Sequence, residues 1–158
     1  MADDKANFIE GDEVILRRCP NKVPGFLNPF DLVTKQPKME TYAVRLQDNE
    51  DGLSCYREAL LERNGQSAVS ASKKRTCYVF SFLARVVREV SGVSQQWDVI
   101  PDPLEDQEDE EETIGHAHAL VTPHRGFRYA ASGQVKKDFT KVRHAIIANA
   151  RAVYCPVA

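Results

Sequence analysis

Short apolar runs and period-two alternations of hydrophobic and polar residues cover much of the chain, and both patterns are typical of β-strands. β-Branched and aromatic side chains are common in these runs, which favours the same structure. The patterns predict strands at residues 13–19, 39–47, 77–83, 97–100, 114–123 and 151–156. Strands of this number indicate a sheet as the centre of the fold.

A period of 3.6 residues near the end of the chain predicts an amphipathic helix over residues 132–150. Its apolar side falls at positions i, i+4, i+7 and i+11, which are Val135, Phe139, Val142 and Ile146. Ser132 is suited to cap this helix, because a serine hydroxyl can accept a hydrogen bond from a backbone N–H of the first turn.

Two shorter helices are predicted between the strands. One begins at Ser54 as its N-cap and ends at Asn64 and Gly65, and the other covers residues 84–90. Residues 76–91 also allow an alternative, in which one long helix replaces the strand and the short helix. We favour the strand, because β-branched and aromatic residues crowd the beginning of this segment.

The predicted elements form one α+β domain over residues 1–158, with a mixed sheet and helices packed against it. A chain of 158 residues can bury a substantial core. It has no apolar run long enough to cross a membrane, and its polar, acidic beginning does not resemble a secretory signal. Four widely spaced cysteines without a CxxC pair then favour reduced thiols and a cytoplasmic protein.

Charge is distributed unevenly, although the formal net charge is only −2. Eight acidic residues and no basic one occur from Asp102 to Glu112, and we expect residues 102–113 to be an exposed, disordered loop between two strands. The part that follows is basic. The candidate binding residues of the two regions are Asp102, Glu105, Asp106, Glu108, Asp109, Glu110, Glu111 and Glu112, and Lys136, Lys137, Lys141 and Arg143.

This charge pattern has several interpretations. The acidic loop could fold back on the basic helix, bind a basic partner protein, compete with nucleic acid for the helix, or serve only solubility. Basic and aromatic residues are interleaved only in the short stretch RGFRY, and the net charge is negative, so binding of nucleic acid is disfavoured.

Three of the four histidines lie in one stretch, GHAHALVTPHRG. On the predicted strand His116 and His118 share one face, while Ala117, Ala119 and Val121 share the other face, beneath the C-terminal helix. Such a pair could hold a metal ion or act as a base, but a metal needs further ligands, and no spacing in the chain matches a closed zinc motif. We favour a structured surface over a metal site.

Two more kinds of residue carry candidate chemistry. Alternation places Arg17 and Arg18 on opposite faces of the first strand, so one of them should point inward toward a carboxylate or an anionic ligand. Cys55 lies near the start of a predicted helix, whose N-terminus would lower the pKa of the thiol. The chain has no glycine-rich phosphate loop of the form GxGxxG or GxxxxGK[ST], so we expect no cofactor.

Four stretches, VILRRCP, LSCYRE, WDVIPDPL and GHAHALV, together resemble a loose pattern in small uncharacterised bacterial proteins. The resemblance implies that Arg17, Ser54, Asp102 and His116 occupy shared positions. It also implies a place beside multi-gene defence or signalling systems, without implying a reaction. The long acidic insertion and the lack of a glycine after HALV depart from the pattern.

Two hypotheses about function follow. We expect a small non-catalytic protein that binds another protein, as an accessory component of a bacterial defence or signalling system. The alternative is an enzyme that acts on a phosphate ester or a nucleotide. In it, His116 or His118 would serve as the base, and Arg17 or Arg18 would bind the anionic substrate.

Overall fold

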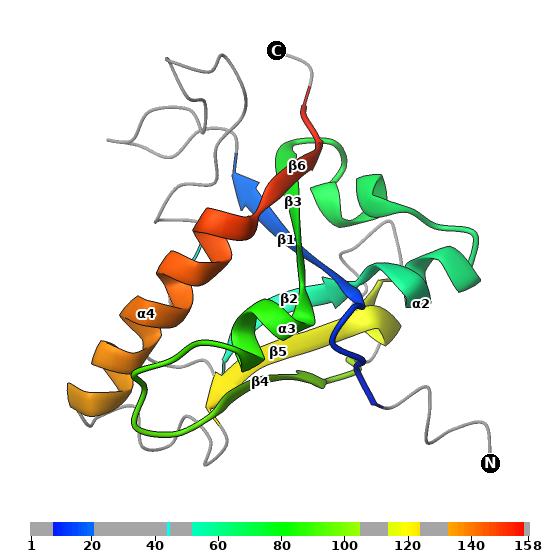
Figure 1. Cartoon of the computed structure of the whole chain (residues 1–158). Coiled ribbons are helices and arrows are strands. Elements are labelled where there is room, and N and C mark those ends of the chain that lie inside the picture. Colours follow the sequence, from blue (N-terminus) through cyan, green and yellow to red (C-terminus); the bar gives the residue numbers. More distant parts are fainter. Residues whose placement is uncertain (1–7, 21–43, 45–51, 105–113, 124–132, 157–158) are drawn as a thin grey trace.

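The computed structural model describes residues 8–20, 44, 52–104, 114–123 and 133–156 (Figure 1). Its strands form one six-stranded sheet in the order β4-β5-β2-β1-β3-β6. They are β1 (Val14–Pro20), β2 (Leu53–Arg57), β3 (Cys77–Leu83), β4 (Trp97–Pro101), β5 (His118–Pro123) and β6 (Arg151–Tyr154). The α-helices are α2 (Glu58–Arg63), α3 (Ala84–Arg88) and α4 (Gly133–Asn149), and the short 3-10 helices are η2 (Ala68–Ser72) and η3 (Gly115–Ala117).

The predicted α+β class, with its C-terminal helix, is confirmed. The strands predicted at residues 13–19, 77–83, 97–100 and 151–156 agree with β1, β3, β4 and β6 to within two residues. We expected a mixed sheet, whereas every pairing between described strands is antiparallel. Antiparallel pairing agrees with the alternating burial along β2, since a central parallel strand is usually apolar on both faces.

Residues 53–57 form a strand, so the prediction that a helix begins at Ser54 is wrong. Leu53, Cys55 and Arg57 are buried at alternate positions, which is the period of a strand, and Arg57 then precedes the first residue of α2. The sequence did not reveal the period-two pattern of Leu53, Cys55 and Arg57, because an arginine is rarely buried unless a partner binds it. Here the Arg57 guanidinium meets the Glu13 carboxylate, with Nε 2.7 Å from Oε1 and Nη2 3.1 Å from Oε2.

A strand and a separate helix also cover the next apolar segment, so the alternative of a single helix over residues 76–91 is wrong. Leu83 has the extended backbone of an N-cap residue between β3 and α3. Three predictions lie outside the described residues. They are the strand at 39–47 (except Val44, which is buried), the Ser132 cap, and the predicted disordered loop 102–113 from residue 105 onward. Residues 102–104 of that loop are described and are not disordered, since the backbone N–H groups of Asp102 and Leu104 donate to the carbonyl oxygens of His118 and Gly115.

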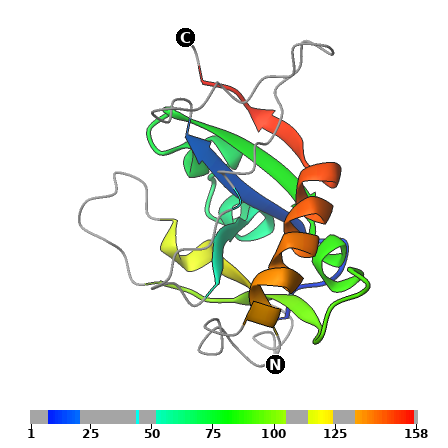
Figure 2. The same cartoon turned by 90° about the vertical axis from the view of Figure 1, so that its left-hand side faces the viewer.

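Two apolar clusters cover the two faces of the sheet. On one face, side chains of α3 and α4 pack on Ile15, Phe80 and Val121 of the strands. On the other face, Leu61 of α2 and residues of η2 and η3 pack on Leu16 and Val79. The turned view shows α3 and α4 together on one side of the sheet (Figure 2). The sheet therefore separates two surfaces that can differ in function.

Asp138 of α4 is completely buried and anchors the helix to the segment before β4. Its carboxylate accepts hydrogen bonds from the Ser94 backbone N–H at 3.0 and 3.1 Å, from the Ser94 hydroxyl at 2.5 Å and from Gln134 Nε2 at 2.9 Å. Burial by itself raises the pKa of Asp138. The hydrogen bonds from Ser94 and Gln134, together with one from Trp97, outweigh that effect, so the pKa lies below its ordinary value.

We predict that Asp138→Asn lowers the free energy of unfolding at pH 7 by about 2 kcal/mol, because hydrogen bonds to a charged acceptor are lost and buried donors keep no equal partner. Urea unfolding followed by circular dichroism measures the change. Asp12→Asn is the control for removal of one acidic residue, since Asp12 is exposed.

The same anchor makes stability depend on pH. The pKa of Asp138 is lower in the folded than in the unfolded chain, so its contribution is complete above the ordinary value of 3.8 and is lost as the pH falls through the folded pKa. The stability difference between the native chain and Asp138→Asn should therefore shrink below pH 3.8. A difference that stays constant from pH 7 to pH 2 would contradict this role.

Candidate functional site

A cavity of about 840 Å³ lies between α3 and α4, beside the outer part of β3. Ser81, Phe82 and Leu83 of β3 line one part of it, and residues of α3, α4 and β6 line the rest. β6 pairs with β3 only as far as Ser81. The cavity therefore lies where the edge strand β6 begins and β3 continues without it. A volume of this size is typical of a ligand site in a protein.

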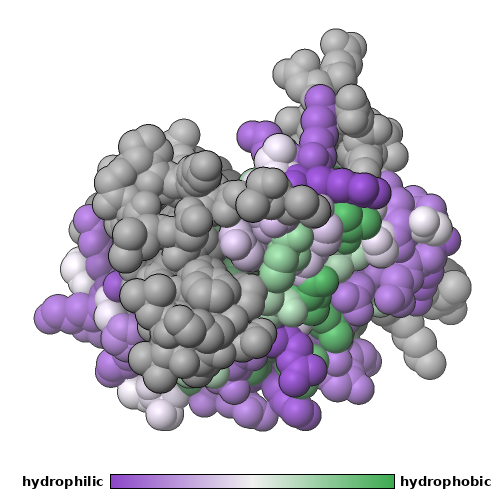
Figure 3. Space-filling view, turned by 90° about the horizontal axis from the view of Figure 1, so that it is seen from above, coloured by the Kyte–Doolittle hydropathy of each residue, from purple (hydrophilic) through white to green (hydrophobic). Residues whose placement is uncertain are grey.

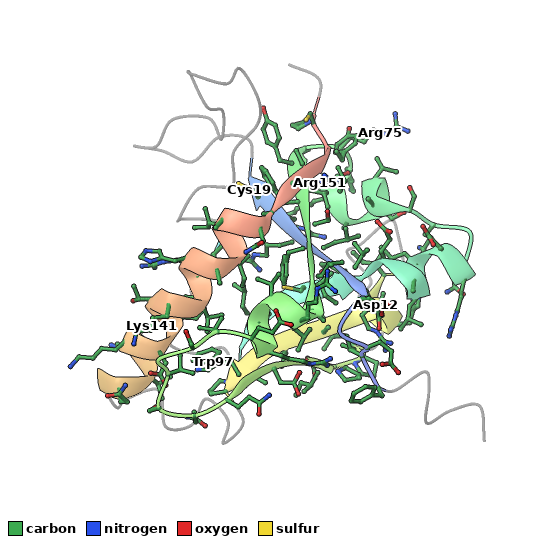
Figure 4. All side chains as sticks on the ribbon, viewed as in Figure 1. Asp12, Cys19, Arg75, Trp97, Lys141 and Arg151 are labelled. Carbon is green, nitrogen blue, oxygen red and sulfur yellow. The ribbon has the colours of Figure 1, made fainter. Side chains whose placement is uncertain are left out.

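Positive charge dominates the lining of this cavity. Arg85 comes from α3, Lys141 and His144 come from α4, and Arg151 is the first residue of β6. Among the described residues that line it, Glu89 is the one that is acidic. Figure 4 marks Lys141 on α4 and Arg151 at the start of β6. Without counting His144, three cations face one anion, so the cavity attracts anionic groups.

Lys141 is held in place by the turn after α3. Its ammonium group donates a hydrogen bond to the Gly92 carbonyl oxygen. Gly92 has a φ of +75°, which favours glycine, and a Cβ there would lie 3.0 Å from Lys141 Nζ. The contact joins α4 to the turn that follows α3, so it fixes the distance between two walls of the cavity.

Of the four basic residues that the sequence marked on the C-terminal helix, only Lys141 lines the cavity. Lys136 and Lys137 are exposed elsewhere on α4, and the Arg143 guanidinium lies over the Phe139 ring at 5.9 Å. Sequence reasoning missed Arg85, His144 and Arg151. No motif joins them, since they come from three elements that only the fold brings together.

The prediction that His116 and His118 share one face of a strand is wrong. His116 lies in η3, where Nε2 is 3.2 Å from the Leu60 carbonyl oxygen and 3.2 Å from Asn64 Nδ2. His118 begins β5 and is 5% exposed, so it belongs to the core rather than to a surface. A turn forms here because Ile114 and Ala117 are both buried in the cluster beneath α2.

His118 is fixed by Asp102, which follows β4. Its Nδ1 lies 2.9 Å from the Asp102 carbonyl oxygen and 3.0 Å from the carboxylate Oδ2. A carbonyl oxygen can only accept, so Nδ1 carries the proton. The Asp102 backbone N–H also donates to the His118 carbonyl oxygen at 2.9 Å. These bonds join the two ends of the connection between β4 and β5. The acidic residues Glu105 to Glu112 belong to this connection and lie outside the described residues.

The second half of the prediction for this stretch is confirmed. Ala119 and Val121 of β5 lie in the same cluster as Phe139, Val142 and Ile146 of α4. Small side chains on the strand allow the helix to approach. Ala117 is the exception, because it packs on the opposite side of the sheet.

Arg17 and Arg18 point to opposite faces, as the alternation predicted. Arg17 Nη1 donates to the Ser54 carbonyl oxygen at 2.6 Å, whereas Arg18 Nε donates to the Ala71 carbonyl oxygen at 2.9 Å. The Arg18 guanidinium also lies 5.4 Å from the centre of the Tyr56 ring.

Arg18, Tyr56 and His118 form a row across three neighbouring strands on the α2 side. The Tyr56 and His118 rings meet edge to face, with centroids 5.6 Å apart. None of these residues lines the α3–α4 cavity, and Arg17 lies on the other face. Among the described residues no three His, Cys, Asp or Glu side chains are grouped closely enough to hold a metal ion.

The four cysteines are free. Cys55 lies in β2 rather than at a helix N-terminus, so the interpretation of a lowered thiol pKa is wrong. Burial raises the pKa of Cys55 to about 12, against the smaller opposing effect of the Arg17 charge. A thiol of that kind is a core residue and a poor nucleophile.

We predict that an aromatic disulfide reagent at pH 8 modifies Cys155 in the folded chain and leaves Cys55 untouched. Cys155 is the exposed cysteine, although partial burial raises its pKa and slows the reaction. Release of thiolate measured by absorbance should fall to near zero in Cys155→Ser until urea is added. Rapid reaction in that variant without urea would show that one of the buried thiols of Cys19, Cys55 and Cys77 is accessible, which would contradict the prediction.

The sequence matches no protein-family model, and comparisons with curated proteins and with solved structures find no match. No helix in the described part of the chain combines the length and the apolarity that crossing a membrane requires.

Proposed function

We propose that this protein is a non-catalytic accessory component that binds another protein, and that the α3–α4 cavity receives a carboxylate-rich segment of that partner. The observation that carries the proposal is the lining of the cavity, where Arg85, Lys141 and Arg151 face a single Glu89. Cations from three separate elements suit several carboxylates spread along a segment better than one compact ion.

The position of the cavity along α4 favours carboxylates over phosphate. Lys141 lies at the middle of the helix and His144 and Asn149 lie in its C-terminal half, whereas phosphate is commonly bound at a helix N-terminus. The negative end of the helix dipole would repel a phosphate dianion there. It repels singly charged carboxylates, which side chains would bind, less strongly.

The polar groups of the lining support binding rather than catalysis. Nucleophilic catalysis by a serine needs a base within hydrogen-bond reach. Ser81, Ser91 and His144 all line the cavity, and in the described part of the chain no hydrogen bond joins the imidazole to either hydroxyl.

The proposed setting is the cytoplasm of a bacterium, beside a defence or signalling system. The resemblance of the short sequence stretches supports the setting. Four free thiols support a reducing compartment, where disulfides are rare.

An enzyme acting on a phosphate ester or a nucleotide is the alternative, and one contact favours it. Asp102 holds His118 by Nδ1 in the way that a carboxylate orients a general base. Hydrolysis of a chromogenic phosphate ester by the purified protein, abolished in His118→Gln, would favour the enzyme over the binding protein.

The binding test uses a fluorescently labelled peptide of alternating glutamate and glycine, with a glutamine version for comparison. We predict that Lys141→Glu combined with Arg151→Glu weakens binding of the glutamate peptide at least tenfold, because two attractive contacts become repulsive, and tenfold corresponds to about 1.4 kcal/mol. Fluorescence anisotropy at several salt concentrations gives the dissociation constants.

Lys136→Glu combined with Lys137→Glu is the matched control, since it makes the same charge change on exposed positions of the same helix. This control should weaken binding much less than the cavity variant. Equal weakening by both variants would mean general attraction to a basic helix. Displacement of the peptide by millimolar inorganic phosphate alone would point instead to a small phosphorylated ligand.

A further inference from the structure

One histidine, His144 of α4, belongs to the lining of the α3–α4 cavity, and the proposed function gives it no role. It follows Lys141 by three residues, and side chains at this spacing are neighbours on one face of a helix. His144 is exposed, and in the described part of the chain its imidazole takes part in no hydrogen bond or ion pair. The ring is therefore available to a ligand that enters the cavity.

The charged groups that share the cavity with His144 come from three elements. Arg85 and Glu89 belong to α3, Lys141 belongs to α4, and Arg151 belongs to β6. Glu89 is the carboxylate of this set. The described residues by which β1 and β3 line the cavity are uncharged, and they are Val14, Ser81, Phe82 and Leu83.

Histidine differs from these charged residues in the pH range over which it changes its charge. Between about pH 8 and about pH 5.5 a histidine side chain commonly gains a proton, whereas lysine and arginine stay protonated and glutamate stays ionised. Carboxylates that enter the cavity add negative charge beside the ring, and negative charge nearby favours a protonated imidazole. Binding of carboxylates and protonation of His144 therefore favour each other.

The surface near the start of β6 suits a charged segment. Seen from above, the end of the molecule that carries β6 has hydrophilic side chains around a narrow hydrophobic strip (Figure 3). Arg151, which begins β6, is exposed. A segment bound by Arg151 could therefore keep its other charges in contact with polar groups and water.

We infer that His144 couples binding in the α3–α4 cavity to the uptake of a proton, so that a carboxylate-rich segment binds more tightly as the pH falls. The inference rests on the proposed function and adds its regulation by pH. The protonated ring is a further cation beside Arg85, Lys141 and Arg151. Because such coupling is reciprocal, the proton is taken up when the segment binds and is released when it leaves.

Fluorescence anisotropy with the labelled glutamate–glycine peptide measures the coupling in the full chain at pH 6 and pH 8, at one ionic strength. We expect the dissociation constant to be about threefold smaller at pH 6, which is the effect of one added ion pair near a protein surface. In His144→Gln the constant should be the same at both pH values. In His144→Lys it should be small at both, because lysine keeps its charge over this range.

His116→Gln is the matched control, because His116 lies in η3 and does not line the cavity. This variant should keep the threefold difference between pH 6 and pH 8. Glu89→Gln tests the other side chain of the lining that could take up a proton, and it should keep the difference as well. A difference that is lost in Glu89→Gln and kept in His144→Gln would assign the proton to Glu89 and overturn the inference.

Isothermal titration calorimetry detects the proton directly. Binding is measured at pH 7 in two buffers of different ionisation enthalpy, and a dependence of the measured heat on the buffer shows proton uptake. We expect uptake by the native chain and by His116→Gln, and none by His144→Gln.

Failure of this inference can be told apart from failure of the proposed function. Binding of the peptide by the native chain with equal strength at pH 6 and pH 8 would overturn the inference and leave the proposed function standing. Absence of binding at both pH values would refute the proposed function and the inference with it. Proton uptake that is unchanged in His144→Gln would overturn the inference alone.

Discussion

The burial of one carboxylate determines where α4 lies, and the rest of the α4 side of the sheet depends on that position. Asp138 is completely buried and needs every hydrogen bond it receives, because an unpaired charge in the interior is very unfavourable. Ser94 satisfies it from the segment before β4. This contact ties the helix to the edge of the sheet farthest from β6, and Trp97 and Phe139 pack beside it with ring centroids 5.8 Å apart.

The position of α4 in turn creates the cavity. Lys141 lies one turn beyond Asp138 and donates to the Gly92 carbonyl oxygen. The contacts of Asp138 and Lys141 therefore hold two successive turns of the helix near α3. Beyond them α4 leads to β6, which pairs with β3 only up to Ser81. The space left between the helices collects cations from α3, α4 and β6. The opposite face differs, since α2 and η2 cover a smaller apolar cluster there and the turn Lys73–Arg75 follows η2.

Two of the wrong predictions from the sequence have a buried polar group as their cause. The period-two pattern of β2 includes Arg57, which is buried only because Glu13, 44 residues earlier, meets it with two hydrogen bonds. His118 belongs to the core only because Asp102 binds its Nδ1. Apolar positions such as Val142 and Ile146 were predicted correctly, since their burial follows from their own side chains.

The sequence by itself determined the α+β class, four strands, the two helices α3 and α4, and the alanine-bearing contact of β5 with α4. Each of these depends on the local period of apolar residues, which is visible in the sequence without knowledge of distant contacts. Only the tertiary structure decided which charges are buried and which converge. Arg85, His144 and Arg151 share no motif, and they line one cavity because α3, α4 and β6 meet there. The left-handed conformation of Lys73–Arg75 was equally absent from the sequence pattern, because buried neighbours and their hydrogen bonds impose it against the local preference of the chain.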